Sequence, residues 1–79
     1  MSAGEPSFTA EIWWTRSDGV RVATVRCDRE RPYDGSDLKG PVIIDGKRYQ
    51  CRSVGGFAHG HPRRAGELID LAVIEEPSL

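Results

Sequence analysis

The sequence predicts a mainly β fold, a small antiparallel sheet or partly open barrel of about five strands with at most one short helical turn. Three observations support this fold class. The 79 residues include nine glycines and five prolines, which favour turns over long helices. Several segments alternate between apolar and polar residues, which is the period of a half-buried strand. An Asp45-Gly46 dipeptide separates two such segments, as in a two-residue β-hairpin.

The first hairpin is expected over residues 7–27. One alternating set of its first strand is predicted to face the core, namely Phe8, Ala10, Ile12 and Trp14. Trp13 belongs to the opposite set and is therefore predicted to point away from the core. Ser17-Asp18-Gly19 predicts the turn, and residues 20–27 predict the returning strand. The apolar positions change parity along that strand, which predicts either a bulge near Val22-Ala23 or a strand that changes layers.

The central hairpin and the last strand follow from the same alternation. The two-residue loop places Val42 opposite Tyr49. The face expected to be buried contains Val42, Ile44, Tyr49 and Cys51, and the outward face contains Ile43, Arg48, Gln50 and Arg52. In the last strand, residues 68–74, Asp70 is expected to point outward, and the inward positions are Ile69, Leu71 and Val73.

The remaining segments are expected to be connections and chain ends. Residues 28–40 have no sustained period and predict a long connection, in which residues 36–39 form at most one helical turn. Residues 59–66 contain too many glycines and prolines for a regular element. The chain is therefore divided into a flexible leader at 1–6, a single β domain at 7–74 and an acidic tail at 75–79.

Composition limits the function classes. The formal net charge of −1 provides no overall field that attracts nucleic acid or an anionic membrane. No apolar stretch has the length of a membrane span, and the first six residues lack the features of a signal peptide. We therefore expect a cytoplasmic protein without a membrane partner. Two cysteines are too few for a disulfide framework, so both are expected to be buried thiols.

The sequence gives only weak support for catalytic or metal-binding residues. A Cys2His2 zinc site would use Cys27, Cys51, His59 and His61, but zinc ligands usually come in pairs two to four residues apart, unlike these cysteines. Cys51 shares the expected apolar inward face with Val42, Ile44 and Tyr49. It therefore lacks the partly exposed, electropositive surroundings that activate a nucleophilic thiol. Asp34 and Asp37 suit turns and caps, and Gly55-Gly56 lacks the Lys and Ser or Thr of a phosphate loop. We therefore expect no metal, no cofactor and no enzymatic activity.

The candidate partner-binding residues are Trp13 and five polar residues, Arg48, Gln50, Arg52, Arg63 and Arg64. A tryptophan on the polar side of a strand is covered by a loop, by a second copy or by a partner, and Trp is enriched in binding hot spots. The polar set, with Phe57 available for stacking, is also typical of a strip that follows a nucleic-acid backbone in OB-fold barrels. An ordinary solvated strand face has a similar composition, so these alternatives stay open.

Two stretches carry a resemblance, residues 45–54 (DGKRYQCRSV) and residues 65–73 (AGELIDLAV). They resemble small proteins of proteobacteria and their phages, among them phage- or mobile-element-encoded inhibitors such as anti-CRISPR proteins. The resemblance implies a non-enzymatic protein of the bacterial host cytoplasm that sterically blocks a CRISPR effector complex. Acidic residues, namely Asp34, Asp37, Asp70 and Glu75-Glu76, would then meet basic nucleic-acid-binding surfaces. The alternative is a small β-barrel that binds nucleic acid directly.

Overall fold

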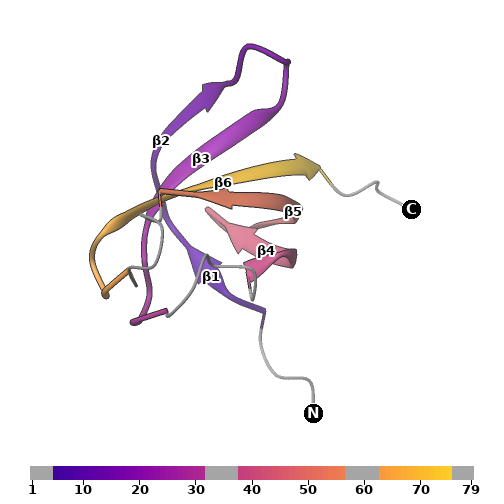
Figure 1. Cartoon of the computed structure of the whole chain (residues 1–79). Helices are drawn as coiled ribbons and strands as arrows, with labels where there is room; N and C mark the ends of the chain where they lie inside the picture. The colour runs from indigo at the N-terminus through magenta and orange to yellow at the C-terminus, as the bar shows by residue number, and fades with distance from the viewer. Residues whose placement is uncertain (1–4, 32–37, 57–62, 76–79) are drawn as a thin grey trace.

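The computed structural model describes residues 5–31, 38–56 and 63–75, and these residues form one six-stranded mixed sheet (Figure 1). The strands are β1 (Ser7–Phe8), β2 (Ala10–Thr15), β3 (Arg21–Arg26), β4 (Gly40–Ile44), β5 (Lys47–Gly55) and β6 (Leu68–Glu75). The mainly β fold class is confirmed. There are six strands where about five were expected, because the first predicted strand is divided into β1 and β2. The helical turn predicted at 36–39 lies mostly outside the described residues.

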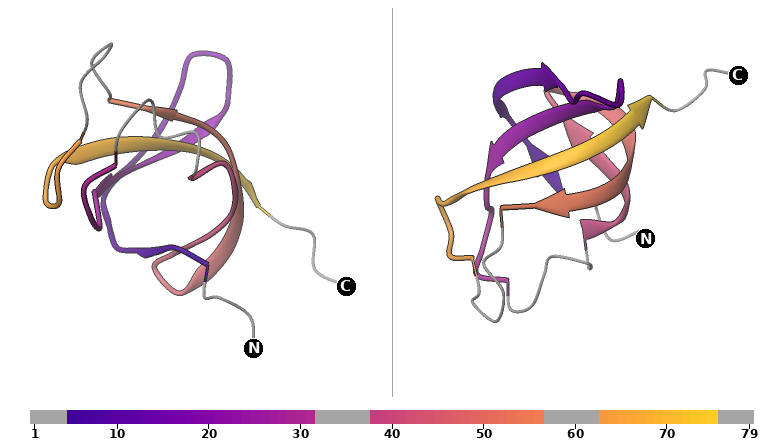
Figure 2. Two further views of the ribbon diagram at one scale, coloured as in Figure 1. Left: turned by 60° about the horizontal axis from the view of Figure 1, so that its bottom comes forward. Right: turned by 45° about the horizontal axis from the view of Figure 1, so that its top comes forward.

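The strand order β1-β4-β5-β6-β3-β2 places the first two strands of the chain at opposite edges of the sheet. β1 pairs with β4 in parallel, and every other pairing is antiparallel. Because only Thr9 separates β1 from β2, the sheet must curl until its two edges approach each other (Figure 2). No ladder of main-chain hydrogen bonds joins the two edge strands, β1 and β2, so the sheet is not a closed barrel. Asp45 links the edges instead, with its main-chain N–H donating to Phe8 O and its Oδ1 accepting from Ala10 N, both at 3.0 Å.

The Asp45-Gly46 hairpin forms as predicted. Val42 lies opposite Tyr49, and the two loop residues have φ angles of 55° and 82°, the positive values that a type I′ turn requires. The predicted inward faces of β4, β5 and β6 are confirmed, since the following side chains form the core together with Phe8, Ala23 and Val25: Val42, Ile44, Cys51, Ile69, Leu71 and Val73. Leu38 joins this core from the long connection, where no periodicity identified it.

The β-bulge of the first hairpin lies in β2, at Glu11, where the register with β3 shifts. The bulge predicted near Val22-Ala23 is therefore wrong. Because a bulge inserts one extra residue, every later side chain of β2 changes face. Ile12 and Trp14 are 58% and 40% exposed, whereas Trp13 packs against the core. The predictions that Trp13 points away from the core and that Ile12 and Trp14 face it are both wrong.

Residues close to both ends of the described segments contribute to the sheet. Ile43 N donates to Pro6 O at 2.8 Å, so the segment predicted as a leader contributes to the sheet. β6 continues to Glu75, a residue predicted to begin the tail. No helix in the described residues has the length and apolarity needed to span a bilayer.

Candidate functional site

The face of the sheet opposite the core carries all the large apolar side chains that are exposed in the described residues. These are Ile12 and Trp14 on β2 and Leu68 and Ile74 on β6. β3 lies between those two strands and contributes Val22, which is only 2% exposed although it faces away from the core. The alternation in β3 therefore changes parity because apolar residues occupy both of its faces, and β3 itself contains no bulge.

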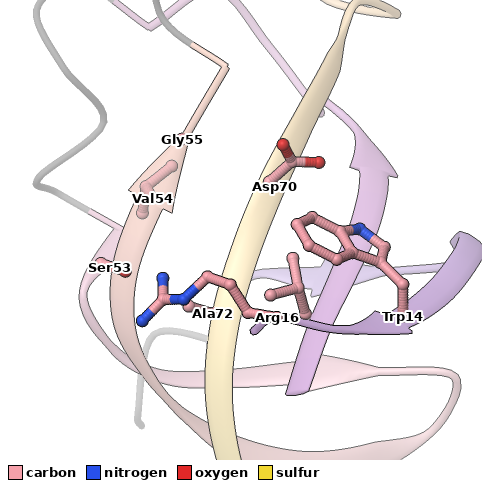
Figure 3. A pocket seen from close by; sticks show the side chains of 8 residues that line it. Trp14, Arg16, Ser53, Val54, Gly55, Asp70 and Ala72 are labelled. Atoms are coloured by element: carbon pink, nitrogen blue, oxygen red, sulfur yellow. The ribbon is translucent and has the colours of Figure 1, made fainter. Parts of the chain in front are cut away.

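A pocket of about 200 Å³ opens on this outer face. It is called the Trp14 pocket here and is lined by Trp14, Arg16, Val22, Ser53, Val54, Gly55, Asp70 and Ala72. Figure 3 shows the indole of Trp14 on one side of β6 and residues 53–55 of β5 on the other. The side chain of Arg16 extends over β6 toward Ser53. The pocket is therefore an open groove across β6 with small side chains in its floor.

Two β-bulges position the side chains of the pocket. The bulge at Glu11 turns Trp14 to the outer face. A second register shift, at Arg52 in β5, brings Ser53 opposite Ala72. Without these two extra residues, the β2 and β5 walls would present the opposite set of side chains, because a one-residue slip exchanges the faces of a strand.

A hydrogen-bonded chain crosses three strands beside the pocket. The Trp14 indole Nε1–H donates to Thr24 Oγ1 at 3.0 Å, and the Thr24 hydroxyl donates to Asp70 Oδ1 at 2.7 Å. This chain holds the indole over β3 and fixes the Asp70 carboxylate next to it. The register supports the arrangement, because Thr24 lies directly opposite Asp70.

Of the two charged groups that line the pocket, Arg16 has an ion-pair partner within the chain and Asp70 has none among the described residues. Arg16 forms a bidentate pair with Asp18, with Nε and the terminal nitrogen at 3.0 and 2.7 Å from the two carboxylate oxygens. The hydrogen bond from Arg16 lowers the pKa of Asp18 to about 2, so both groups are charged at neutral pH. Asp70 forms no ion pair with any residue of the described segments. Its carboxylate is the uncompensated charge of the pocket.

Trp13 lies at one end of the inner face, in an aromatic and charged cluster. Its ring centroid is 5.3 Å from that of Tyr49, and the Arg21 guanidinium lies 4.7 Å above its ring. The indole Nε1–H donates to Asp45 Oδ2 at 3.1 Å. Lys47 stands over the Tyr49 ring at 5.9 Å. The candidate anchor is therefore covered by its own chain, and its role as a partner-binding residue stays a prediction.

The other predicted binding residues do not gather at one place. Arg48, Gln50 and Arg52 lie along β5 on its outward side, as expected from the alternation. Arg63 donates to Gly56 O just beyond the other end of β5. Eight residues of extended chain separate that end from Arg48, roughly 25 Å. Arg64 is exposed beside Arg63, and Phe57 lies outside the described residues.

The two cysteines are buried free thiols, as predicted. Cys51 on β5 and Arg21 on β3 both lie opposite Val73 of β6, so they are at the same level of the sheet. Cys27 follows Arg21 by six residues, which places the two cysteines roughly 20 Å apart along the strand direction. The Cys27 thiol donates to Arg29 O at 3.0 Å, and the Cys51 thiol donates to Ser53 O at 3.5 Å. This separation does not suit a shared metal ion. The described segments contain no metal-binding group of residues, and the two histidines lie outside them.

Cys51 is expected to resist alkylation in the native protein. Burial raises the pKa of its thiol to about 11, so at about pH 8 only about 0.1% is thiolate, against roughly a quarter for an ordinary cysteine. Iodoacetamide labelling followed by mass spectrometry should show slow modification in buffer and fast modification in guanidinium chloride. Equal rates in the two solvents would contradict the buried setting.

Comparison of the chain with protein-family models, with curated proteins and with solved structures finds no match.

Proposed function

We propose that this chain is a non-enzymatic protein-binding module whose Trp14 pocket receives one basic side chain of a partner protein. The observation that carries the proposal is the Asp70 carboxylate, which lies beside the partly exposed Trp14 indole and has no ion-pair partner among the described residues. Both groups attract a cation: the indole face through its ring quadrupole, and the carboxylate through its full negative charge.

The size of the pocket supports a single side chain as its occupant. Pockets for small-molecule ligands usually enclose about 300–1,000 Å³, and the Trp14 pocket encloses about 200 Å³. Its floor is apolar, formed by Val22 and Ala72. An arginine or lysine would lay its aliphatic stem on that floor while its charged head meets Asp70. Trp and Arg are also the residue types that dominate binding hot spots.

The pairing of the arginines favours a protein partner over nucleic acid. Five arginines of the described segments form ion pairs with carboxylates of this chain: Arg16–Asp18, Arg26–Glu11, Arg31–Asp28, Arg48–Glu5 and Arg63–Glu67. Neutralised cations release few counterions from a phosphate backbone, and this release supplies most of the affinity for nucleic acid. The described arginines outside these pairs are spread over β3, β5 and two connections, whereas direct nucleic-acid binding would be supported by unpaired cations in one strip; they are Arg21, Arg29, Arg52 and Arg64.

The most concrete partner is a CRISPR effector complex, as for a phage-encoded inhibitor. This part of the proposal rests on the resemblance of residues 45–54 and 65–73. Surfaces that bind nucleic acid are rich in Arg and Lys, which is the chemistry that the Asp70 carboxylate complements. Occupation of such a surface blocks a nuclease without any catalysis by the inhibitor.

Three substitutions in the pocket are expected to weaken inhibition of a purified effector complex. Trp14→Ala removes the indole, and a hot-spot truncation of this kind typically costs about 2 kcal/mol or more of binding. Asp70→Asn keeps the acceptor for Thr24 but removes the charge, which should weaken binding by about tenfold or more, since charged hydrogen bonds contribute ~1.5–3 kcal/mol. Gly55→Val fills the groove from an ordinary strand position. A Cβ there lies 3.7 Å from Asp70 Cβ, a normal contact. Target-DNA cleavage by effector complexes of several types, with each variant as competitor, measures the effect.

The matched control is Glu30→Gln, which removes an exposed carboxylate away from the pocket and should leave binding unchanged. Thermal unfolding of each variant establishes that the fold is retained. Full inhibition by all three pocket variants would contradict the assigned surface. Absence of binding to every effector tested, together with a steeply salt-dependent shift of a labelled oligonucleotide, would favour direct nucleic-acid binding instead.

A further inference from the structure

β2 forms one edge of the sheet, and part of its main chain is directed away from β3. Arg16 N donates to Val20 O at 2.8 Å, so these residues form a hydrogen-bonded pair of the hairpin. Such pairs alternate in an antiparallel ladder, which makes Trp14 the next hydrogen-bonded position. The N–H and C=O groups of Trp13 and Thr15 therefore point outward. No other described strand pairs with β2.

The second half of this edge lacks the features that normally prevent strand addition. Charged side chains, prolines, bulges and covering segments protect natural edges. In β2 the bulge at Glu11 and the hydrogen bond from Ala10 N to Asp45 protect the first half. Residues 12–15 (IWWT) contain no charge and no proline. The turn of the β2–β3 hairpin also projects away from the other strands (Figure 1).

We propose that two copies of this chain pair antiparallel through these edges, with a two-fold axis at Trp14. In that register Trp13 of one copy lies opposite Thr15 of the other, and each such pair exchanges two N–H···O bonds. The outward groups of Trp13 and Thr15 are those that this register requires. The two Trp14 residues then face each other as a non-hydrogen-bonded pair.

The side chains around the proposed axis are complementary. On the outer face, Ile12 of one copy lies opposite Arg16 of the other, whose aliphatic stem can cover it while its guanidinium stays paired with Asp18 of its own copy. The Trp14 rings do not obstruct the contact, since each leans over β3 toward Thr24 in its own copy. The open part of the edge is centred on Trp14, so a second copy turned about that residue offers the same two outward positions in register and is the occupant that the edge fits.

The dimer goes beyond the proposed function and changes how it operates. A two-fold axis through the edge joins the two sheets with their outer faces on the same side. Both Trp14 pockets then open in one direction, so the dimer would be bivalent toward a partner with two sites. Linking two sites in this way raises avidity without any new contact.

The full chain is expected to sediment at twice its mass of 8.7 kDa as its concentration rises. Thr15→Pro should keep it monomeric at every concentration. The substitution removes an outward N–H and leaves the β2–β3 ladder intact, so the variant should retain its circular dichroism spectrum. Thr15→Val, which keeps the N–H, is the matched control and should remain dimeric. A wild-type chain that stays at the monomer mass, or a dimer that persists in Thr15→Pro, overturns the proposal.

Cysteine cross-linking decides the register even where Thr15→Pro fails to fold. Two residues facing each other in a non-hydrogen-bonded pair have Cα atoms about 4.5 Å apart, which a disulfide can span. Trp14→Cys is therefore expected to form a covalent dimer under mild oxidation, whereas Glu30→Cys should not. Equal cross-linking of the two variants, or none in Trp14→Cys, would refute pairing at β2.

Discussion

Trp13→Ala is expected to lower the free energy of unfolding by about 3 kcal/mol, the lower end of the range for a large aromatic truncated against a core. The side chain contacts the core, and its ring packs at 5.3 Å from Tyr49. The substitution also leaves Asp45 Oδ2 without its indole donor and removes the ring beneath Arg21. Each loss affects the link between β2 and the β4–β5 hairpin.

The control is the neighbouring tryptophan. Trp14→Ala should cost roughly 1 kcal/mol, because its side chain is 40% exposed and removing it opens the outer groove without leaving a closed cavity. Urea unfolding followed by far-ultraviolet circular dichroism compares the two variants without depending on the fluorescence that each loses. A larger cost for Trp14→Ala than for Trp13→Ala would show that the face assignment in β2 is inverted.

This pair of residues shows how far the sequence carries the prediction. Two adjacent tryptophans in a regular strand lie on opposite faces, so the sequence could predict that one of them faces away from the core. The choice between Trp13 and Trp14 required counting from Phe8. One extra residue at Glu11 reverses that count, and nothing in the local sequence marks the bulge. A parity argument is therefore reliable only between bulges.

The central hairpin was predictable because its determinants are local. The positive φ angles at Asp45-Gly46 suit those two residue types, and a two-residue loop fixes which residues face each other. The Trp14 pocket has no such local cause. It requires the strand order β5-β6-β3, which brings Ser53 beside Ala72 and Thr24 beside Asp70. These pairings join segments up to 46 residues apart, beyond the reach of periodicity.

Gly56→Ala is expected to cost about 3 kcal/mol, because two effects combine at this position. Gly56 has a φ angle of +92°, a region in which a side chain costs about 1–2 kcal/mol. A Cβ would also lie 3.2 Å from Ile69 Cα and 3.3 Å from Leu68 O, main-chain atoms at the start of β6. Displacing them adds an overpacking cost of about 1–3 kcal/mol.

Gly19→Ala separates the two effects. Gly19 has nearly the same φ angle, +89°, but a Cβ there meets nothing within 4 Å. Its substitution should therefore cost only the backbone strain, about 1–2 kcal/mol. The difference between the two variants in urea unfolding measures how closely the end of β5 approaches β6, the contact that supports one end of the Trp14 pocket through Gly55 and Asp70. Equal losses of stability would mean that this close approach does not exist in solution.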